Sequence, residues 1–538
     1  MTAGTAPGGV RAGAQAGTPD GLPDEAPVHV PWGATWPDLP TFRRLARDRR
    51  VVPVVRRLLA DDVTPVGLFR TLAAGRPGTF VLESAESDGT WGRFSFVGVR
   101  SMASLTVHEG RARWTGEVPA GIPTEGDVLD VLRTTLEVLR TPRIPGLPTL
   151  TGGLVGSLGW DVVRHWEPTL PAAAVDDLGV PEVALVLATD LAVVDHHDGS
   201  VWLVADAVNT DGTDERVDEA YADALARVEA MHTALGHPAP PALAALADVE
   251  EPALEFRTTQ AEYEDAVRAG QRAIRDGDVF QVVLSQRLDL DCPAEPLDVY
   301  RVLRTLNPSP YMYCVHLQDA DGRDFAVVGS SPETLVKVEA GHVTTFPIAG
   351  SRPRGATPEE DRRLGDEVLA DPKERAEHVM LVDLSRNDLA KVCDPRSVEV
   401  VEFMTVRRYS HIQHICSTVV GRMHERATAL DAFTATFPAG TLSGAPKPRA
   451  IALIDEIEPT RRGTYGGTVG YFDFAGDMDM AIAIRTALVR DGRASVQAGA
   501  GIVADSVPVT EYEESRNKAA AAVRAVQIAA RLRGAARP

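Results

Sequence analysis

Cysteine is scarce in this 538-residue chain, which contains only Cys292, Cys314, Cys393 and Cys416. No two of them form a Cys-x-x-Cys pair, and a chain of this length with so few cysteines does not depend on disulfides. The composition therefore predicts a reduced, cytoplasmic protein.

Long apolar runs are also missing. The longest, near residues 183–194, is interrupted by Asp190 and is too short to span a bilayer. The first 24 residues are rich in Gly, Ala, Pro and Thr and lack the apolar segment of a signal peptide. Neither a membrane segment nor a secretion signal is predicted.

Positive charge is in deficit, because 55 Lys and Arg residues stand against 76 Asp and Glu residues and give a net charge of −21. Nucleic acids and anionic membrane surfaces attract basic proteins, so neither is expected as the main partner. An anionic substrate would need a local cluster of Arg, Lys and backbone N–H groups, or a metal ion.

The pattern along the chain predicts four segments. Residues 1–36 are rich in Gly, Ala and Pro and are expected to form a disordered extension. An N-terminal region follows over 37–236, then a Pro/Ala-rich linker over 237–255 and a catalytic domain over 256–534. Strand and helix runs are segregated, which predicts an α+β fold in which large antiparallel sheets carry helices on the outside.

Two pairs of acidic residues indicate a metal site. Glu374 and Glu377 share one face of a helix that begins near Pro372, and Glu511 and Glu514 form a second such pair downstream. If the two helices face each other, a hard cation such as Mg²⁺ would relieve the repulsion between the carboxylates. From spacing alone, two solvated helix faces are the commoner explanation.

The surrounding motifs carry a resemblance. Six blocks occur in a fixed order, namely 331–333 (Ser-Pro-Glu), 347–355, 371–388, 441–447, 498–503, and Glu511-x-x-Glu514 with Lys518. Residues 256–532 resemble the chorismate-utilising enzyme family, which includes anthranilate, aminodeoxychorismate, isochorismate and salicylate synthases. Residues 82–84 (Leu-Glu-Ser) and 152–156 add a resemblance to the anthranilate synthases.

Three positions separate members of this family. Gln281 stands where isochorismate and salicylate synthases resemble one another in having a water-activating lysine, and glutamine cannot be that base. Ala349 stands where many aminodeoxychorismate synthases have a nucleophilic lysine, and alanine forms no covalent adduct. Residues 307–312 resemble a tryptophan-binding segment of anthranilate synthases. Ser351 departs from the usual threonine but keeps the hydroxyl.

The resemblance implies that chorismate and ammonia are converted to anthranilate and pyruvate with Mg²⁺ as cofactor. Glu377 and Glu514 are the implied ligands, with Glu374 and Glu511 nearby. The implied substrate-binding residues are Gly350, Ser351, Tyr465, Arg485, Gly499, Ala500, Gly501 and Lys518.

The implied catalytic residues are Glu333, Thr441 and His414. Glu333 is expected to donate a proton to the leaving hydroxyl, and Thr441 to complete the pocket. His414 matches the histidine associated with pyruvate loss, although a strand histidine without that resemblance is more often structural.

Partners are implied in the same way. Because no cysteine lies in a Gly-x-Cys-x-Gly turn, a separate glutamine amidotransferase subunit is expected, in a hetero-oligomer. Tryptophan is expected to inhibit the enzyme through Pro53, Leu82, Glu83, Ser84, Pro310, Tyr311 and Met312. From the residue types alone, ordinary sheet packing is the commoner explanation.

Three alternatives remain at the sequence level. The chain could be a 2-amino-2-deoxyisochorismate synthase that stops before pyruvate loss, or an aminodeoxychorismate synthase. An inactive regulatory homologue is the alternative from another class, and the presence of both acidic pairs, Arg485, Lys518 and His414 argues against it.

Overall fold

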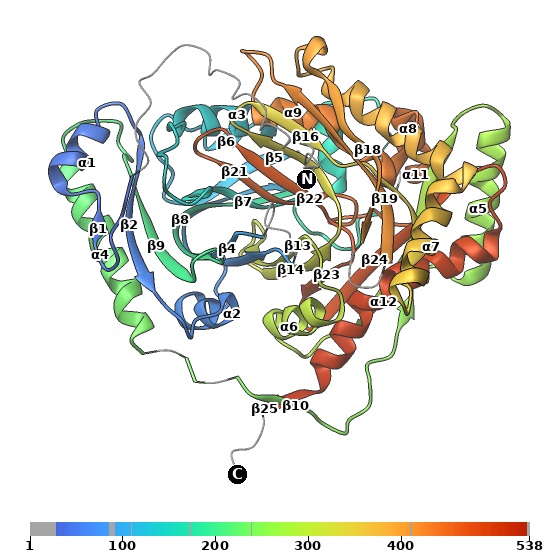
Figure 1. Cartoon of the computed structure of the whole chain (residues 1–538), viewed down its shortest axis with the longest axis horizontal. Coiled ribbons are helices and arrows are strands. Elements are labelled where there is room, and N and C mark those ends of the chain that lie inside the picture. Colours follow the sequence, from blue (N-terminus) through green and yellow to red (C-terminus); the bar gives the residue numbers. More distant parts are fainter. Residues whose placement is uncertain are drawn as a thin grey trace, which may run out of the picture.

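The strands of the protein form one continuous antiparallel sheet that bends into two halves, with helices on its outer faces (Figure 1). The computed structural model describes residues 28–534, apart from 86–91, 109, 172–173, 238, 241 and 409–411. The predicted α+β class with large antiparallel sheets and outer helices is confirmed.

The first half of the sheet contains most strands of the N-terminal region and the strands next to the C-terminus. Its order is β1 (Thr35–Trp36), β2 (Val51–Leu59), β9 (Ser200–Val208), β8 (Val183–Asp195), β4 (Phe94–His108), β3 (Phe80–Glu83), β13 (Tyr311–Gln318), β14 (Asp324–Ser331), β23 (Thr486–Arg490), β24 (Arg493–Ile502) and β12 (Gln281–Asp291), with β11 (Glu255–Phe256) and β20 (Gly444–Ala445) on β12.

The second half shares two strands with the first. Its order is β6 (Glu125–Gly126), β5 (Arg111–Gly116), β4, β8, β7 (Gly153–Leu158), β21 (Thr468–Asp473), β22 (Met478–Ile482), β15 (Thr334–Glu339), β16 (His342–Thr345), β19 (Ile412–Arg422) and β18 (Glu399–Arg408), with β17 (Ile348–Pro353) also on β19.

The two halves are joined by two shared strands and by two corners at which one strand runs into the next. β4 and β8 belong to both halves, and their register shifts between Gly98 and Ala103, where bulges allow a bend. β14 continues into β15 across residues 332–333, and β22 into β23 across residues 483–485. Glu333 and Arg485 therefore lie at two corners between the halves.

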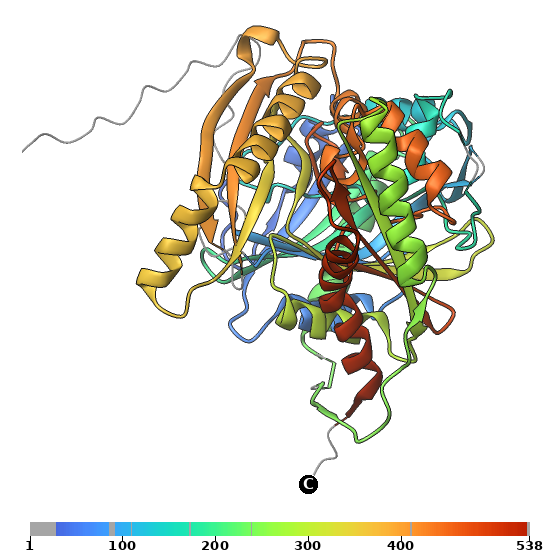
Figure 2. The ribbon, with the colours of Figure 1, turned by 90° about the vertical axis from the view of Figure 1, so that its right-hand side faces the viewer.

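The longer helices cover the outer faces of the sheet. Figure 2 shows α12 (Pro508–Arg531) and α5 (Gln260–Arg275) side by side, with α7 (Pro358–Ala370) and α8 (Pro372–Leu389) against β17–β19. The other helices are α1 (Leu39–Leu45), α2 (Pro65–Leu68), a π-helical turn (Phe69–Ala73), α3 (Val128–Val138), α4 (Val217–Leu235), α6 (Pro296–Leu306), α9 (Ala429–Thr436), α10 (Gly440–Ser443), α11 (Lys447–Ile457) and the 3₁₀ turns Trp160–His165 and Pro395–Ser397.

The predicted limits of the segments need one correction. Residues 1–27 lie outside the described residues, but residues 28–36 pack on the fold. The Val28 N–H donates to the Pro145 carbonyl at 2.8 Å, Val30 is buried, and Thr35 pairs with Arg56. The prediction continued the disordered extension to residue 36, because the two-residue strand β1 leaves almost no pattern in the sequence.

The N-terminal and C-terminal regions also share one sheet. β3 pairs with β13 and β7 pairs with β21, so strands of each region complete the other. Within the predicted linker, β10 (Ala244–Leu246) pairs with β25 (Leu532–Gly534) beside the C-terminal helix. The linker therefore joins two regions that have a common framework.

Candidate active site

The two corners between the sheet halves are hydrogen-bonded to each other. The Ile482 N–H donates to the Glu333 carbonyl at 2.9 Å, and the Ser330 N–H donates to the Arg485 carbonyl at 3.2 Å. Arg485 has a φ of 51°, a left-handed conformation that costs a residue with a side chain roughly 1–2 kcal/mol. The framework thus holds this side chain in a strained position, as is common at functional sites.

Glu333 is a carboxyl group that can exchange a proton near neutral pH. The Thr441 hydroxyl donates to its Oε1 at 2.8 Å. Burial raises the pKa of Glu333 to about 7, although the Thr441 hydroxyl and the charges of Lys518 and Arg485 oppose the shift. A group with this pKa suits general acid catalysis, the role that the family resemblance implies for Glu333.

His414 lies on β19 opposite Ser351 of β17. Its Nδ1–H donates to the Gly350 carbonyl at 2.8 Å, because a carbonyl can only accept. Burial lowers the pKa of His414, helped by the charges of Arg485 and Lys518 and opposed by that hydrogen bond. The neutral ring therefore has its basic lone pair on Nε2.

Gly350 lies in β17, where the register with β19 shifts, and its position requires a glycine. Its φ is 63°, and a Cβ there would lie 3.1 Å from Oε2 of Glu374 on α8. A side chain would be strained and would press on the acidic helix. The same residue therefore orients His414 and lets α8 lie close to β17.

The glycine-rich strand offers two backbone N–H groups rather than three. The Ser285 N–H donates to the Glu458 carboxylate, on the side of β12 that faces away from β24. Ser285 and Gly499 are therefore a non-hydrogen-bonded pair of the ladder. Because N–H directions alternate along a strand, the N–H groups of Gly499 and Gly501 point away from β12. The N–H of Ala500 points into the ladder with β12, so this group is not available to a ligand, and the substrate-binding role of Ala500 stays a prediction.

Lys518 lies on the same side as these N–H groups. Its Nζ donates to the Gly499 carbonyl at 3.2 Å and pairs with Glu514 at 2.7 Å. The side chain of Gln281, one of the positions that separate family members, also lies beside Gly501. A Cβ on Gly501 would meet its Nε2 at 2.5 Å.

The acidic pairs of α8 and α12 face one another. Burial is the main cause that raises the pKa of Glu377, and the charges of Glu374, Glu514 and Glu511 raise it further. Burial also raises the pKa of Glu511, with a further contribution from Glu514. These effects place the two acidic pairs near enough to influence each other, and the metal site itself stays a prediction.

The four carboxylates are not arranged around one metal-binding position in this structure. Glu514 pairs with Lys518, and Glu374 lies 3.5 Å from a nitrogen of Arg352. Among the residues that the structure describes, no three His, Cys, Asp or Glu side chains are grouped closely enough to hold an ion. The oxygen donors fit Mg²⁺ chemically, and the fit requires the paired side chains to turn away from their cations.

Tyr465 and Asn307 complete the surroundings of Arg485. Tyr465 is buried, and burial raises its pKa, so its hydroxyl remains a donor. An Nη atom of Arg485 donates to Oδ1 of Asn307 at 3.4 Å. The sequence analysis placed Asn307 only in the segment expected to bind an inhibitor, and nothing in its local pattern pointed to Arg485.

The residues predicted to bind tryptophan are brought together only in part. Met312 of β13 lies opposite Glu83 of β3, whose carboxylate accepts from Arg304 at 3.2 Å. Tyr311 donates instead to Asp479 at 2.9 Å. Pro53 lies on β2, which β9, β8 and β4 separate from β3 along the sheet.

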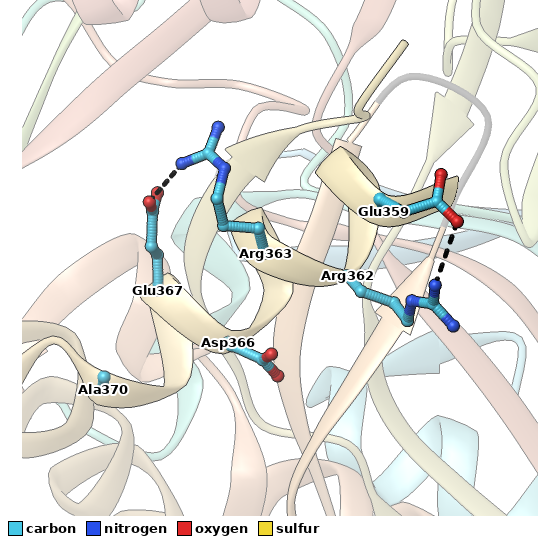
Figure 3. Close-up of a pocket in the computed structure, with 6 residues that line it drawn as sticks. All are labelled: Glu359, Arg362, Arg363, Asp366, Glu367 and Ala370. Carbon is cyan, nitrogen blue, oxygen red and sulfur yellow. Dashed lines mark hydrogen bonds and ion pairs between the residues drawn. The ribbon is translucent and has the colours of Figure 1, made fainter. Parts of the chain in front are cut away.

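A shallow hollow on α7 lies apart from these groups (Figure 3). Its side chains are exposed ion pairs along one helix, such as Arg363 with Glu367 and Arg362 with Glu359. Exposed pairs of this kind are typical of a solvated helix face.

Comparison with known proteins identifies the family. The family model described as chorismate binding enzyme matches residues 79–524. The chain belongs to the chorismate binding enzyme family. It is 57% identical to anthranilate synthase component 1 of Arthrobacter globiformis over 93% of this chain and 94% of that one. It is 56% identical to the protein of the same name from Mycolicibacterium smegmatis, over 91% and 94%.

A solved structure supports the same assignment. The crystal structure of anthranilate synthase component I from Streptococcus pneumoniae TIGR4 matches this family member with a TM-score of 0.70 and 35% identity, over 82% of this chain and 94% of that one. The resemblance found in the sequence motifs is thereby confirmed. Within the described part of the chain, no helix is both long and apolar enough to cross a membrane.

Proposed function

We propose that this protein is the chorismate-converting component of an anthranilate synthase. Chorismate and ammonia would give anthranilate, pyruvate and water. The observation that carries the proposal is the pair of corners at which Glu333, with a pKa of about 7, lies near the half-buried cation Arg485. An acid for a leaving hydroxyl and a cation for a carboxylate are what this substrate requires.

The acidic face of α8 and α12 supports Mg²⁺ as the cofactor. Glu377 and Glu514 would hold the ion, with Glu374 and Glu511 beside them. The bound ion would supply Lewis acidity at the ring carboxylate of chorismate.

The protein's own residues account for the remaining steps. Arg485 holds the enolpyruvyl carboxylate, and Tyr465 donates a hydrogen bond to it. Glu333 gives its proton to the C4 hydroxyl, which leaves as water while ammonia forms a bond to C2, and the new ammonium group returns a proton to Glu333. His414 accepts the C2 proton at Nε2 as the C3–O bond breaks and the ring becomes aromatic. The enolpyruvate that leaves takes up this proton at its methylene carbon and becomes pyruvate.

Ammonia and regulation imply partners outside this chain. The names of the relatives as component 1 support a second component, for which a glutamine amidotransferase is the proposed identity. Feedback inhibition by tryptophan is proposed at the group around Glu83 and Met312. A cytoplasmic location is also proposed, because chorismate, tryptophan and glutamine amidotransferases belong to soluble metabolism.

The test is a fluorescence assay of the purified chain with chorismate, ammonium and Mg²⁺. Fluorescent anthranilate and one equivalent of pyruvate should form, and omission of Mg²⁺ should abolish both. Glutamine without a partner should give no product. A non-aromatic amino product without pyruvate would instead identify a 2-amino-2-deoxyisochorismate synthase, and no turnover would refute the proposal.

A further inference from the structure

Arg462 is a completely buried arginine behind the proposed substrate pocket. Arginine is almost never fully buried unless it is paired, and here the partner is Glu458 at the end of α11. Nε donates to Oε2 of Glu458 at 2.9 Å, and Nη2 donates to Oε1 at 2.6 Å. The pair is therefore bidentate, the strongest geometry for these two groups.

The remaining donors of Arg462 bind the backbone of two other segments. Nη1 donates to the Leu442 carbonyl of α10 at 2.7 Å, directly after Thr441. Nη2 also donates to the Val283 carbonyl of β12 at 2.8 Å. One guanidinium thus connects the segment that carries Thr441 to the strand beside the glycines.

Glu458 also binds β12, at Ser285, two residues after Val283. Its Oε1 accepts both the N–H and the hydroxyl of Ser285 at 2.8 Å. Val283 and Ser285 are the residues of β12 that pair with Gly501 and Gly499. The pair therefore binds the outer edge of β12 directly opposite the two N–H groups proposed to hold an anion.

Aromatic contacts connect Arg462 to Tyr465, another residue proposed to bind the substrate. Cζ of Arg462 lies 4.3 Å from the centre of the Trp160 ring and 5.4 Å from that of Tyr465. A guanidinium over an aromatic face is attracted by the ring's negative face, and burial strengthens this attraction. The orientation of Tyr465 is thus coupled to the same side chain.

We propose that the Arg462–Glu458 pair is a positioning device that sets Thr441, Tyr465 and the glycine strand in one geometry for binding chorismate. This inference rests on the proposed function. The described contacts of both residues go to each other, to backbone carbonyls, to Ser285 and to the rings of Trp160 and Tyr465, so each acts through the residues that it holds. Lysine cannot replace this arginine, because it lacks the planar fork that binds a carboxylate and two carbonyls together.

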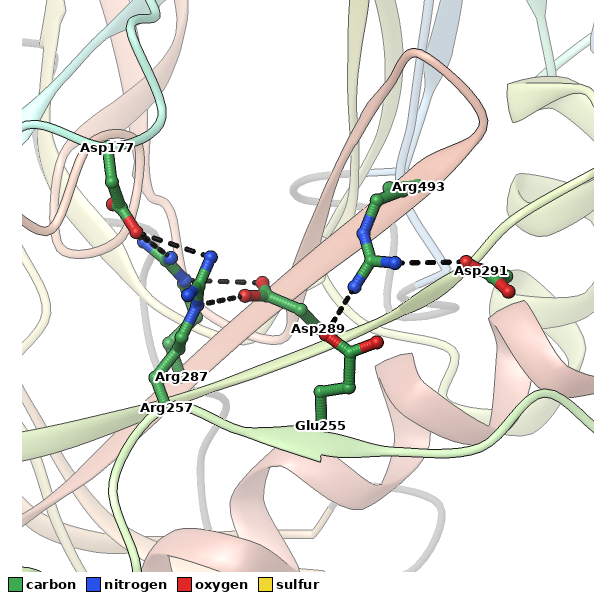
Figure 4. A network of polar contacts seen from close by, with 7 residues as sticks. All are labelled: Asp177, Glu255, Arg257, Arg287, Asp289, Asp291 and Arg493. Atoms are coloured by element: carbon green, nitrogen blue, oxygen red, sulfur yellow. Dashed lines mark hydrogen bonds and ion pairs between the residues drawn. The ribbon is translucent and has the colours of Figure 1, made fainter.

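The test compares Arg462→Lys and Glu458→Gln with Arg287→Lys as a matched control. Arg287 is also buried, lies on the same strand β12, and forms a bidentate pair with Asp177 (Figure 4). Its ion pairs join β12 to Asp177 and reach Asp289 within β12 itself, and they involve neither Thr441 nor Tyr465. All three variants should lower the melting temperature, which controls for a general loss of stability.

The kinetic readout separates positioning from stability. Below the melting transition, Arg462→Lys and Glu458→Gln should lower kcat/KM for chorismate about 10- to 100-fold, chiefly through KM, as expected for displaced binding groups. Arg287→Lys should leave kcat/KM close to that of the wild type. Glu458→Gln keeps the shape of the side chain and serves if Arg462→Lys does not fold.

The pH profile gives a second readout. The groups that face Glu333 are Thr441, Lys518, Arg485 and Tyr465. Loss of the Thr441 hydrogen bond removes an influence that lowers the pKa of Glu333, so the alkaline limb of kcat/KM should move to higher pH. Arg462→Lys should shift this limb in the same direction as Thr441→Val, and Arg287→Lys should not shift it.

Two results would overturn the inference. One is an unchanged KM and alkaline limb in the folded Arg462→Lys or Glu458→Gln variant. The other is an equal loss of kcat/KM in Arg287→Lys. An inactive wild-type chain would refute the proposed function instead, and the two failures are thereby distinguished.

Discussion

The corner between the sheet halves and the acidic face of α8 and α12 differ in how far the protein's own atoms complete them. At the corner, Glu333 is bound by Thr441, and Arg485 is fixed by a strained backbone. On the acidic face, Glu377 and Glu511 have raised pKa values partly because carboxylates repel, and Glu514 is neutralised by Lys518.

The difference has a physical cause. A site for an organic anion can be built in advance from backbone N–H groups and a buried arginine, because each also bonds to the framework. A site for Mg²⁺ consists of like charges, so it is complete only when the ion supplies the opposite charge. The corner is therefore expected to be rigid without ligands, and the acidic face to depend on the ion.

The largest effect should come from the corner. Arg485→Lys should reduce kcat/KM for chorismate about 10²- to 10³-fold, because a preorganised bidentate donor is lost. Arg490→Lys, at the far end of the strand β23 that follows Arg485, with an ion pair to Asp319, is the control and should have little effect. Steady-state kinetics at saturating Mg²⁺ measure both, and an equal response of the two variants would contradict the rigid-corner interpretation.

The acidic face should respond through the ion. Glu514→Gln should raise the Mg²⁺ concentration for half-maximal activity about 10- to 100-fold, because the ion loses charge from its donor set. Glu513→Gln changes an exposed neighbour with the same chemistry and should leave the Mg²⁺ titration unchanged. If both variants titrate like the wild type, Glu514 is not a ligand.

Stability should depend on pH through Glu333. The folded-state pKa is raised from 4.5 to about 7, so the folded protein favours the protonated form. This contribution is fully present below pH 4.5 and is lost as pH rises towards 7, at a cost of up to about 3 kcal/mol. Glu333→Gln should therefore gain stability relative to the wild type between pH 4.5 and 7, as chemical denaturation at several pH values can measure. A constant difference would contradict the raised pKa.

The smallest effect on catalysis should come from the proposed inhibitor group. Met312→Thr and Ser84→Arg should weaken inhibition by tryptophan and leave kcat within about twofold, because Met312 is buried beside Glu83 on β13 and is not one of the residues proposed to bind the substrate. Inhibition curves with and without tryptophan test this. Equal inhibition of both variants and the wild type would remove this group from the proposal.

The regular elements could be read from local patterns. The capping box of Thr259 and Glu262 marks the start of α5 in the sequence, and Pro372 begins α8 as predicted. The spacing of Glu374 with Glu377 placed both on one helix face, because helical periodicity is a local property. The short strand at Thr35 was missed, since two residues cannot show a period.

The sequence by itself determined which residue types are present and on which elements they lie, and its motifs determined the family. Only the tertiary structure decided that Glu333 and Arg485 meet at paired corners, that Ala500 points its N–H into the ladder, and that Arg462 lies behind the pocket. These facts depend on strand pairing and burial between segments far apart in the chain. Local sequence does not encode such contacts, because their energy arises only when the sheet is assembled.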